Sequence, residues 1–369
     1  MTPTLDALAT SLAARVPVIL WGGPGTGKTS AISAMATRSE LPVEVVIASI
    51  REPSDFGGLP VVDERSVRFA PPMWAERLAA EGRGVLFLDE LSTAPPAVQA
   101  ALLRVVLERH VGDLQLPEEV MVVAAANPPD QAADGWELAP PLANRFCHLD
   151  WSTDARTWAE GSLSGWPVPP IRPLAEGAVQ AAASTHRARI GAFLVGRPGL
   201  LSKLPDDATT AGRAWPSPRS WTMASTLLGA NDLLEGGPSL AAVLLAGCVG
   251  PGAALEYRAW VDEAGLIDPE EALRDPSSFR MPERGDRAYA ALSSIVAAVR
   301  ADATPERWVA AWHAIASAVG SGQVDLAVAV MRPLVELRPA GAIPPREALA
   351  IVAPVLREAG LLDRLAGPG

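Results

Sequence analysis

The feature that most constrains the fold is a glycine-rich stretch between an apolar run and a helix-like segment. The run Val16–Trp21 is followed by Gly22, Gly23, Pro24, Gly25, Thr26, Gly27, Lys28 and Thr29, and then by AISAMATRSE. This order fits the pattern G-x-x-x-x-G-K-[ST] between a strand and a helix. Glycines let the backbone curl until successive N–H groups point inward, and the amino end of the following helix adds its positive dipole. The stretch therefore predicts a cradle for phosphate oxygens.

Apolar runs alternate with helix-like stretches over the first 150 residues. This alternation predicts an α/β domain in which a parallel sheet is covered by helices on both faces. The five predicted strands are Val16–Trp21, Val43–Ile50, Val85–Leu88, Val120–Ala126 and Phe146–Trp151. We expect the insertion at about residues 51–83 to contain a short hairpin, because Leu59–Val62 and Val67–Phe69 can pair around Asp63–Ser66.

Strand patterns disappear after residue 152. Proline-rich joints such as 165–173 separate stretches rich in alanine and leucine, which predicts an all-helical remainder. We predict a nucleotide-binding core at 1–152, a small helical lid at 153–236 and a C-terminal helical extension at 237–369. Trp308 and Trp312 are four residues apart and share a helix face, which favours a packed helical core over a cofactor site.

Composition excludes some classes of function. The 31 basic and 42 acidic side chains give a formal charge of −11, which argues against a protein that coats nucleic acid through many cations. The longest apolar stretch, Leu240–Val249, is far short of the roughly 20 residues of a spanning helix, so we expect no membrane insertion. Only two cysteines, Cys147 and Cys248, are present and no signal-peptide pattern is seen, so we expect a cytoplasmic protein.

Polar residues end two of the predicted strands. Asp89 and Glu90 end the buried run GVLFLDE, and Asn127 ends VMVVAAAN. Carboxyl ends of parallel strands share one edge of the sheet with the phosphate loop. There Thr29 and Asp89 are suited to hold Mg²⁺, Glu90 to activate a water, and Asn127 to position that water or contact the γ-phosphate. Lys28, one of two lysines among the 31 basic residues, would lie beside the β- and γ-phosphates.

Two arginines follow in order. Arg145 stands just before the last predicted strand, in PPLANRF, and Arg219 at the start of a predicted helix, in AWPSPRSW. Taken singly, an arginine is usually a solvated surface group, Asp-Glu a solvated strand end, and Asn127 as readily a turn residue. It is their order after the phosphate loop that singles these residues out.

This order resembles the core of AAA+ ATPases. The resemblance implies that Lys28 and Thr29 belong to Walker A, that Asp89 and Glu90 form Walker B, and that Asn127 is sensor 1. It also implies that Arg145 is the arginine finger and Arg219 is sensor 2. Arg104 and Arg109 lie where a subunit boundary can form, and either is an alternative finger.

Within that superfamily the chain is similar to MoxR-type ATPases, relatives of the magnesium chelatase ATPase subunit. Four stretches carry the likeness, which covers about the first 150 residues and PSPRSW and is weak beyond Gly237: LWGGPGTGKTS, PSDFGGLP, FLDELSTAPPAVQAALLRVVLERHVG and AAANPPDQAADGWELAPPLANRF. The resemblance implies ATP and Mg²⁺ as cofactors. It implies a homo-oligomeric ring, commonly a hexamer, that acts like a chaperone. Such a ring remodels or activates a protein partner, often one with a von Willebrand A domain or a metal-cofactor enzyme.

Other functions share this ATPase core. Against a nucleic-acid motor or clamp loader stand the charge of −11 and the lack of a recognisable nucleic-acid-binding motif. Against a nucleotide-dependent scaffold stand the intact Glu90 and Asn127, which a protein without hydrolysis does not need. For the insertion at 51–83, a pore- or substrate-facing hairpin and an exposed decoration of the sheet both stay open, since insertions in loops cost little.

Overall fold

The computed structural model describes residues 3–63, 66–128, 136–264 and 267–366. The chain forms two compact units. The first unit combines Met1–Glu176 with Ser202–Ala254, and the second combines Gly177–Leu201 with Leu255–Gly369. The three parts predicted from the sequence, a core at 1–152, a lid at 153–236 and an extension at 237–369, are a different division of the chain and stay a prediction.

The first unit is built on a five-stranded parallel sheet in the order β2-β5-β8-β1-β9. Its strands are β1 (Val18–Trp21), β2 (Val43–Ile47), β5 (Arg83–Asp89), β8 (Glu119–Ala126) and β9 (Cys147–Asp150). Every residue of β1 is buried, as expected for an inner strand covered on both faces. The predicted α/β class is confirmed. The second predicted strand is too long, because the chain turns into a 3₁₀ helix, η1 (Ala48–Ile50), after Ile47.

Helices surround this sheet and continue beyond it. One face of the sheet carries a core in which Ile19 and Leu88 are packed with Leu102, and all three side chains are fully buried. The helices of the first unit are α1 (Pro3–Ala13), α2 (Lys28–Arg38), α3 (Ser54–Gly57), α4 (Met73–Glu81), α5 (Pro96–Glu108), α6 (Pro140–Ala143), α7 (Ala155–Ser164), α9 (Ala208–Ala211), α10 (Pro218–Leu233) and α11 (Gly237–Val249), with the 3₁₀ helix η2 (Leu91–Thr93).

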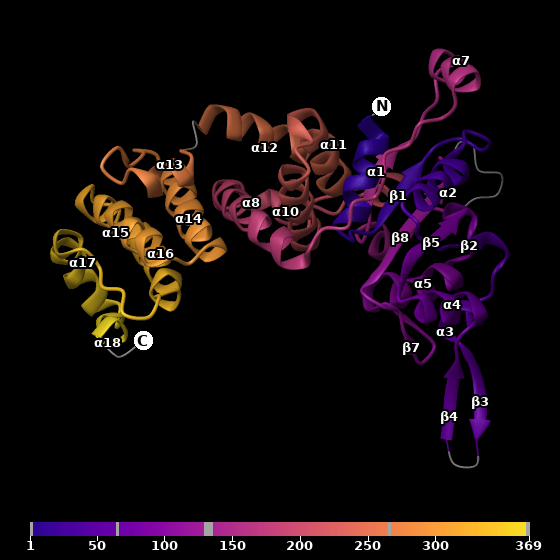
Figure 1. Ribbon diagram of the computed structural model, residues 1–369, viewed down its shortest axis with the longest axis horizontal. Coiled ribbons are helices and arrows are strands. Elements are labelled where there is room, and N and C mark those ends of the chain that lie inside the picture. Colours follow the sequence, from indigo (N-terminus) through magenta and orange to yellow (C-terminus); the bar gives the residue numbers. More distant parts are fainter. Residues whose placement is uncertain (1–2, 64–65, 129–135, 265–266, 367–369) are drawn as a thin grey trace. The chain divides into compact units, whose positions relative to one another are not determined.

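A two-stranded hairpin projects from the body of the first unit (Figure 1). It pairs β3 (Leu59–Asp63) with β4 (Ser66–Ala70), which confirms the expected hairpin, while residues 64–65 of its turn lie outside the described residues. A second hairpin, β6 (His110–Val111) with β7 (Leu114–Gln115), is hydrogen-bonded to strand β4 of the first hairpin. Asp113 accepts a hydrogen bond from the Phe69 amide at 2.7 Å and donates its own amide to the Phe69 carbonyl at 3.0 Å.

The second unit is helical. Apart from residue 176 and residues 251–254, which are grouped with the first unit, its helices are α8 (Glu176–Gly196), α12 (Pro251–Ala264), α13 (Pro269–Arg274), α14 (Gly285–Ala301), α15 (Pro305–Gly320), α16 (Val324–Glu336), α17 (Arg346–Glu358) and α18 (Leu362–Ala366), with the 3₁₀ helix η4 (Pro198–Leu200). After residue 152 the described ranges contain helices and no strand, as predicted.

Two tryptophans lie in the core of the second unit. Trp308 and Trp312 are fully buried, with ring centroids 5.6 Å apart, and the Trp308 indole donates to the Leu334 carbonyl at 2.7 Å. The expected packed core is confirmed.

Within the described ranges no helix combines the length and apolarity that crossing a bilayer requires.

Candidate nucleotide site

The glycine-rich stretch forms the loop between β1 and α2. Gly25 and Gly27 have φ of 73° and 89°, a region that glycine enters without steric cost, and Gly27 caps the amino end of α2. Trp151, just after β9, donates its indole N–H to the Thr26 carbonyl at 3.0 Å. The loop is therefore held from the neighbouring strand with the amino end of a helix beside it, which is the geometry of a phosphate cradle.

Lys28 lies folded against this loop. Its side chain is 7% exposed, and its Nζ donates to the carbonyls of Gly22 at 2.6 Å and Gly23 at 2.9 Å. The same Nζ donates to Asn127 Oδ1 at 3.3 Å, across 99 residues of sequence. Burial lowers the pKa of Lys28, while the carboxylate of Asp89 acts to raise it. The structure thus brings Lys28 and Asn127 together at the carboxyl edge of the sheet.

Thr29 and Asp89 meet at the same edge. The Thr29 hydroxyl donates to Asp89 Oδ2 at 3.0 Å. A hydroxyl and one carboxylate are hard oxygen ligands, and Mg²⁺ is commonly held by one or two carboxylates together with substrate phosphates and water. The residues present therefore fit a magnesium site next to the phosphate loop.

Glu90 has a partner that the sequence did not reveal. Its backbone is left-handed, with φ of 56°, and its Oε2 accepts a hydrogen bond from the Ser49 hydroxyl at 2.5 Å. Ser49 lies in η1, directly after β2, whereas the sequence pattern predicts that it lies inside a strand, Val43–Ile50. No sequence signal therefore points to Ser49. The contact holds the carboxylate of Glu90 toward the end of the neighbouring strand β2.

Asn127 is fixed by its backbone as well as by its side chain. Its amide donates to the Ser92 hydroxyl at 3.0 Å, and Ser92 belongs to η2, directly after the Asp89-Glu90 pair. Asn127 therefore connects the end of β8 with the turn after β5. The polar residues predicted at two strand ends lie together, while residues 129–135 of the stretch after Asn127 lie outside the described residues.

Arg145 and Arg219 lie elsewhere in the first unit. Arg145 precedes the amino end of β9, whose Cys147 pairs with Val18, the first residue of β1. The phosphate loop follows the carboxyl end of β1, so about 10 Å of strand, at about 3.3 Å per residue, separates the two levels. Burial lowers the pKa of Arg145, and the positive charge of nearby Arg219 lowers it further. Asn144 and Ser217, close to them in sequence, are joined by a hydrogen bond of 2.7 Å, so the two arginines lie in neighbouring segments.

The alternative finger residues have other partners. Arg109 has a left-handed backbone, and its Nη2 donates to the carbonyls of Pro117 at 2.7 Å and Glu118 at 2.9 Å, and to that of Val120. Arg104 pairs with Glu108 at 3.2 Å on the exposed side of α5. The guanidinium of Arg109 is therefore bound to backbone carbonyls of the segment that follows the β6–β7 hairpin. These hydrogen bonds leave it little freedom to reach another subunit.

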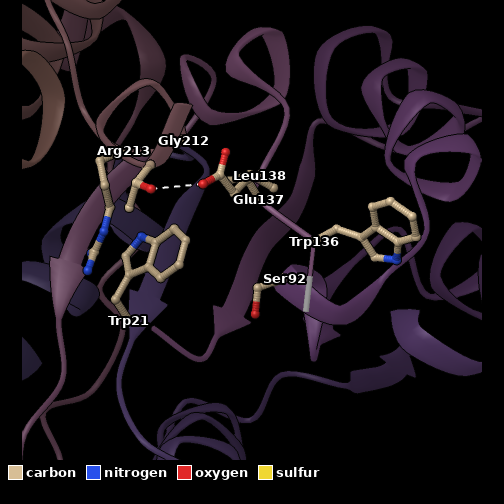
Figure 2. Close-up of a pocket in the computed structure, with 8 residues that line it drawn as sticks. Trp21, Ser92, Trp136, Glu137, Leu138, Gly212 and Arg213 are labelled. Carbon is tan, nitrogen blue, oxygen red and sulfur yellow. Dashed lines mark hydrogen bonds between the residues drawn. The ribbon is translucent and has the colours of Figure 1, made fainter. Parts of the chain in front are cut away.

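A small pocket opens beside the residue that precedes the loop. Figure 2 shows Arg213 next to Trp21, and the distance from its guanidinium carbon to the indole centroid is 4.0 Å. Arg213 also pairs with Asp150 at 3.2 Å, and Ser92 and Glu137 line the same pocket. Sequence reasoning missed Arg213, because nothing in the pattern separates it from other surface arginines. It connects the segment before α10 with the carboxyl ends of β1 and β9.

Comparison with known proteins agrees with this geometry. Residues 17–147 match the family described as ATPase family associated with various cellular activities (AAA). No curated protein matches the sequence. Residues 17–147 are therefore a domain of the AAA ATPase class.

Solved structures with partial similarity include a candidate ATPase from Cytophaga hutchinsonii, with a TM-score of 0.40 and 18% identity over 66% of this chain and 80% of that one. A full-length MCM homolog from Methanopyrus kandleri gives a TM-score of 0.35 and 17% identity over 66% of this chain and 55% of that one. Because both scores are below 0.5, the class rests on the family match and on the sheet itself.

Proposed function

We propose that the protein is an ATPase of the MoxR type that assembles as a ring, commonly a hexamer, and remodels or activates a protein partner. The observation that carries the proposal is the meeting of three polar pairs at one sheet edge: Lys28 with Asn127, Thr29 with Asp89, and Ser49 with Glu90. These pairs supply a cation for phosphate, oxygen ligands for a metal, and a carboxylate for water.

Each group has a task in hydrolysis. Backbone amides of the loop and Lys28 bind the phosphates of ATP. Thr29 and Asp89 would hold Mg²⁺, which when bound would supply positive charge to the phosphates. Glu90 orients the attacking water and accepts its proton. Ser49 holds one oxygen of this carboxylate, Oε2, at 2.5 Å, and so fixes where the carboxylate of Glu90 lies. Asn127 positions the water or contacts the γ-phosphate.

Arg145 is proposed to act on the neighbouring subunit. Arg145 lies at the amino end of β9, whereas the phosphate loop of the same subunit follows the carboxyl end of β1. A head-to-tail ring is therefore the arrangement that brings Arg145 to a nucleotide. Arginine fingers supplied in trans contribute about 10³ to 10⁵ in rate. Hydrolysis would then depend on assembly, and dilution should lower turnover per subunit.

Subunit mixing tests the trans arrangement. Lys28→Ala and Arg145→Ala are each expected to abolish turnover alone. In a one-to-one mixture, a productive interface needs an intact phosphate loop facing an intact arginine, so about one quarter of wild-type turnover should return. A mixture that stays inactive contradicts action in trans. Arg156→Ala, an exposed arginine paired with Glu160, is the matched control and should keep full turnover alone.

The partner is expected to contact the β3–β4 hairpin. Pro60 pairs with Phe69 and Val62 with Val67, so these four exposed apolar side chains share one face of the ribbon. A two-stranded hairpin with exposed apolar residues is marginally stable by itself and gains from a protein contact. Partners can be trapped with Glu90→Gln and ATP and identified after capture; we expect a von Willebrand A protein among them. Deletion of residues 59–69 should spare ATP binding and abolish stimulation by the captured partner, and unchanged stimulation contradicts this role.

A further inference from the structure

A buried carboxamide lies directly beside the proposed finger. Asn144 is 4% exposed and stands between α6 and β9, next to Arg145. Its Oδ1 accepts a hydrogen bond from the Ser217 hydroxyl at 2.7 Å, and its Nδ2 donates to the Trp215 carbonyl at 3.2 Å. Both ends of one side chain therefore hold the segment that leads into α10, 73 residues further along the chain.

Ser217 in turn fixes the first turn of α10. It is the N-cap residue, and its hydroxyl accepts the Ser220 amide at 3.1 Å, while the Ser220 hydroxyl accepts the Ser217 amide at 2.8 Å. Both serines are buried. Arg219 lies between them, so its backbone position is set by the same network that ends on Asn144.

The two arginines make a positive site that lacks a described acidic partner. No ion pair joins Arg145 or Arg219 to a carboxylate in the ranges 3–63, 66–128, 136–264 and 267–366. Arg145 Nε is buried with no partner there, although its Nη1 donates to the Pro141 carbonyl. Asn144 and Ser217, which flank the two arginines in sequence, are hydrogen-bonded to each other, and a phosphate is a suitable anion for two guanidinium groups in such neighbouring segments.

We propose that Asn144 is a positioning residue that holds Arg219 beside Arg145, so that the two guanidinium groups meet one phosphate of a bound nucleotide as a unit. The inference rests on the proposed ATPase function and on Arg145 as the finger. Asn144 itself touches no nucleotide. It sets where the amino end of α10 lies relative to the start of β9, and a displacement of about 1 Å between reacting groups can lower turnover about 10²-fold.

Asn144→Ala tests this role in the full chain. We expect kcat to fall about 10²-fold while the dissociation constant for ATP, measured in the Glu90→Gln background, stays unchanged. Asn231→Ala is the matched control, because Asn231 is a 3% exposed asparagine near the other end of α10 that donates to the Gly237 carbonyl. It should lower stability without lowering kcat. Equal kcat losses in both variants, or none in Asn144→Ala, would overturn the proposal.

A second set of variants separates positioning from folding. Ser217→Asp keeps a helix cap but has no hydroxyl to donate to Asn144, so it should reproduce the kcat loss in a folded protein. Arg219→Ala should lower kcat in the wild type but add little in the Asn144→Ala background, because the pair is already separated. Fully additive losses would overturn the proposal, as would wild-type kcat in Ser217→Asp.

Failure of the proposed ATPase mechanism and failure of the role of Asn144 give different results in these assays. If Arg145→Ala alone keeps wild-type turnover, the finger assignment fails and the role of Asn144 with it. If Arg145→Ala is inactive while Asn144→Ala keeps wild-type kcat, only the positioning role is overturned.

Discussion

The residue Gly22 offers a sharp test of how the phosphate loop is built. A Cβ at this position would lie 2.4 Å from the carbonyl oxygen of Trp151 and 3.1 Å from its Cβ. Ordinary contact begins at 3.4 Å, so one backbone must move by 3.4 − 2.4 = 1.0 Å. Neither moves freely, since the Gly22 amide donates to Ala126 at 3.1 Å and the Trp151 amide donates to Trp21 at 2.7 Å.

Gly22→Ala should therefore displace the loop in a folded protein. A misplacement of about 1 Å can cost about 10²-fold in rate, which corresponds to about 2.7 kcal/mol of transition-state stabilisation. We expect kcat/KM for ATP to fall by that factor, measured by phosphate release under steady-state conditions. Thermal unfolding followed by circular dichroism will show whether the variant is folded at the assay temperature.

A control glycine has open space around it. A Cβ on Gly177, in α8, meets nothing within 4 Å, so Gly177→Ala should leave kcat/KM unchanged. If Gly22→Ala also keeps kcat/KM within about threefold of the wild type, the contact with Trp151 does not fix the loop, and the reasoning is refuted.

Two further predictions concern stability. His148 is buried and accepts the Trp21 indole N–H at 2.9 Å, and burial lowers its pKa to about 4. Because the unfolded chain takes up this proton near pH 6.5 and the folded one only near pH 4, stability should be full above pH 6.5 and fall by about 3 kcal/mol as pH drops to about 4. His148→Gln should flatten the curve of melting temperature against pH over that window, and an identical curve would contradict this assignment. In the second unit, Trp308→Ala should cost about 3–5 kcal/mol by denaturant titration, because it empties a fully buried site; a loss no larger than that of Ile351→Ala, 46% exposed in α17, would show that this core is not well packed.

Much of the first unit was predictable because its signals are local. A strand, a glycine loop and a helix follow one another between Val18 and Arg38, so sequence order alone requires the cradle. The hairpin of β3 and β4 likewise needs only neighbours in sequence. The strand ends at Asp89 and Asn127 were placed by a general rule, that carboxyl ends of parallel strands meet at one edge.

The tertiary structure decided what depends on contacts between distant segments. Ser49 meets Glu90 only because β2 lies beside β5, and the pattern of residues 43–50 cannot show that the strand stops at Ile47. Arg109 resembled a finger in sequence, but its guanidinium is occupied by backbone carbonyls that follow a hairpin. The buried hydrogen bonds of Asn144 show that residues near 145 and 219 lie together.

The amino-acid sequence by itself determined the phosphate loop, the class of fold and the helical character of the rest, because hydrophobic period and glycine placement act over a few residues. The tertiary structure alone decided which side chain holds Glu90, that the segments of Arg145 and Arg219 are neighbours, and that Gly177–Leu201 belongs with the C-terminal helices in one compact unit. The physical reason is that burial and hydrogen bonding between remote segments depend on how the helices pack, and no short pattern encodes that packing.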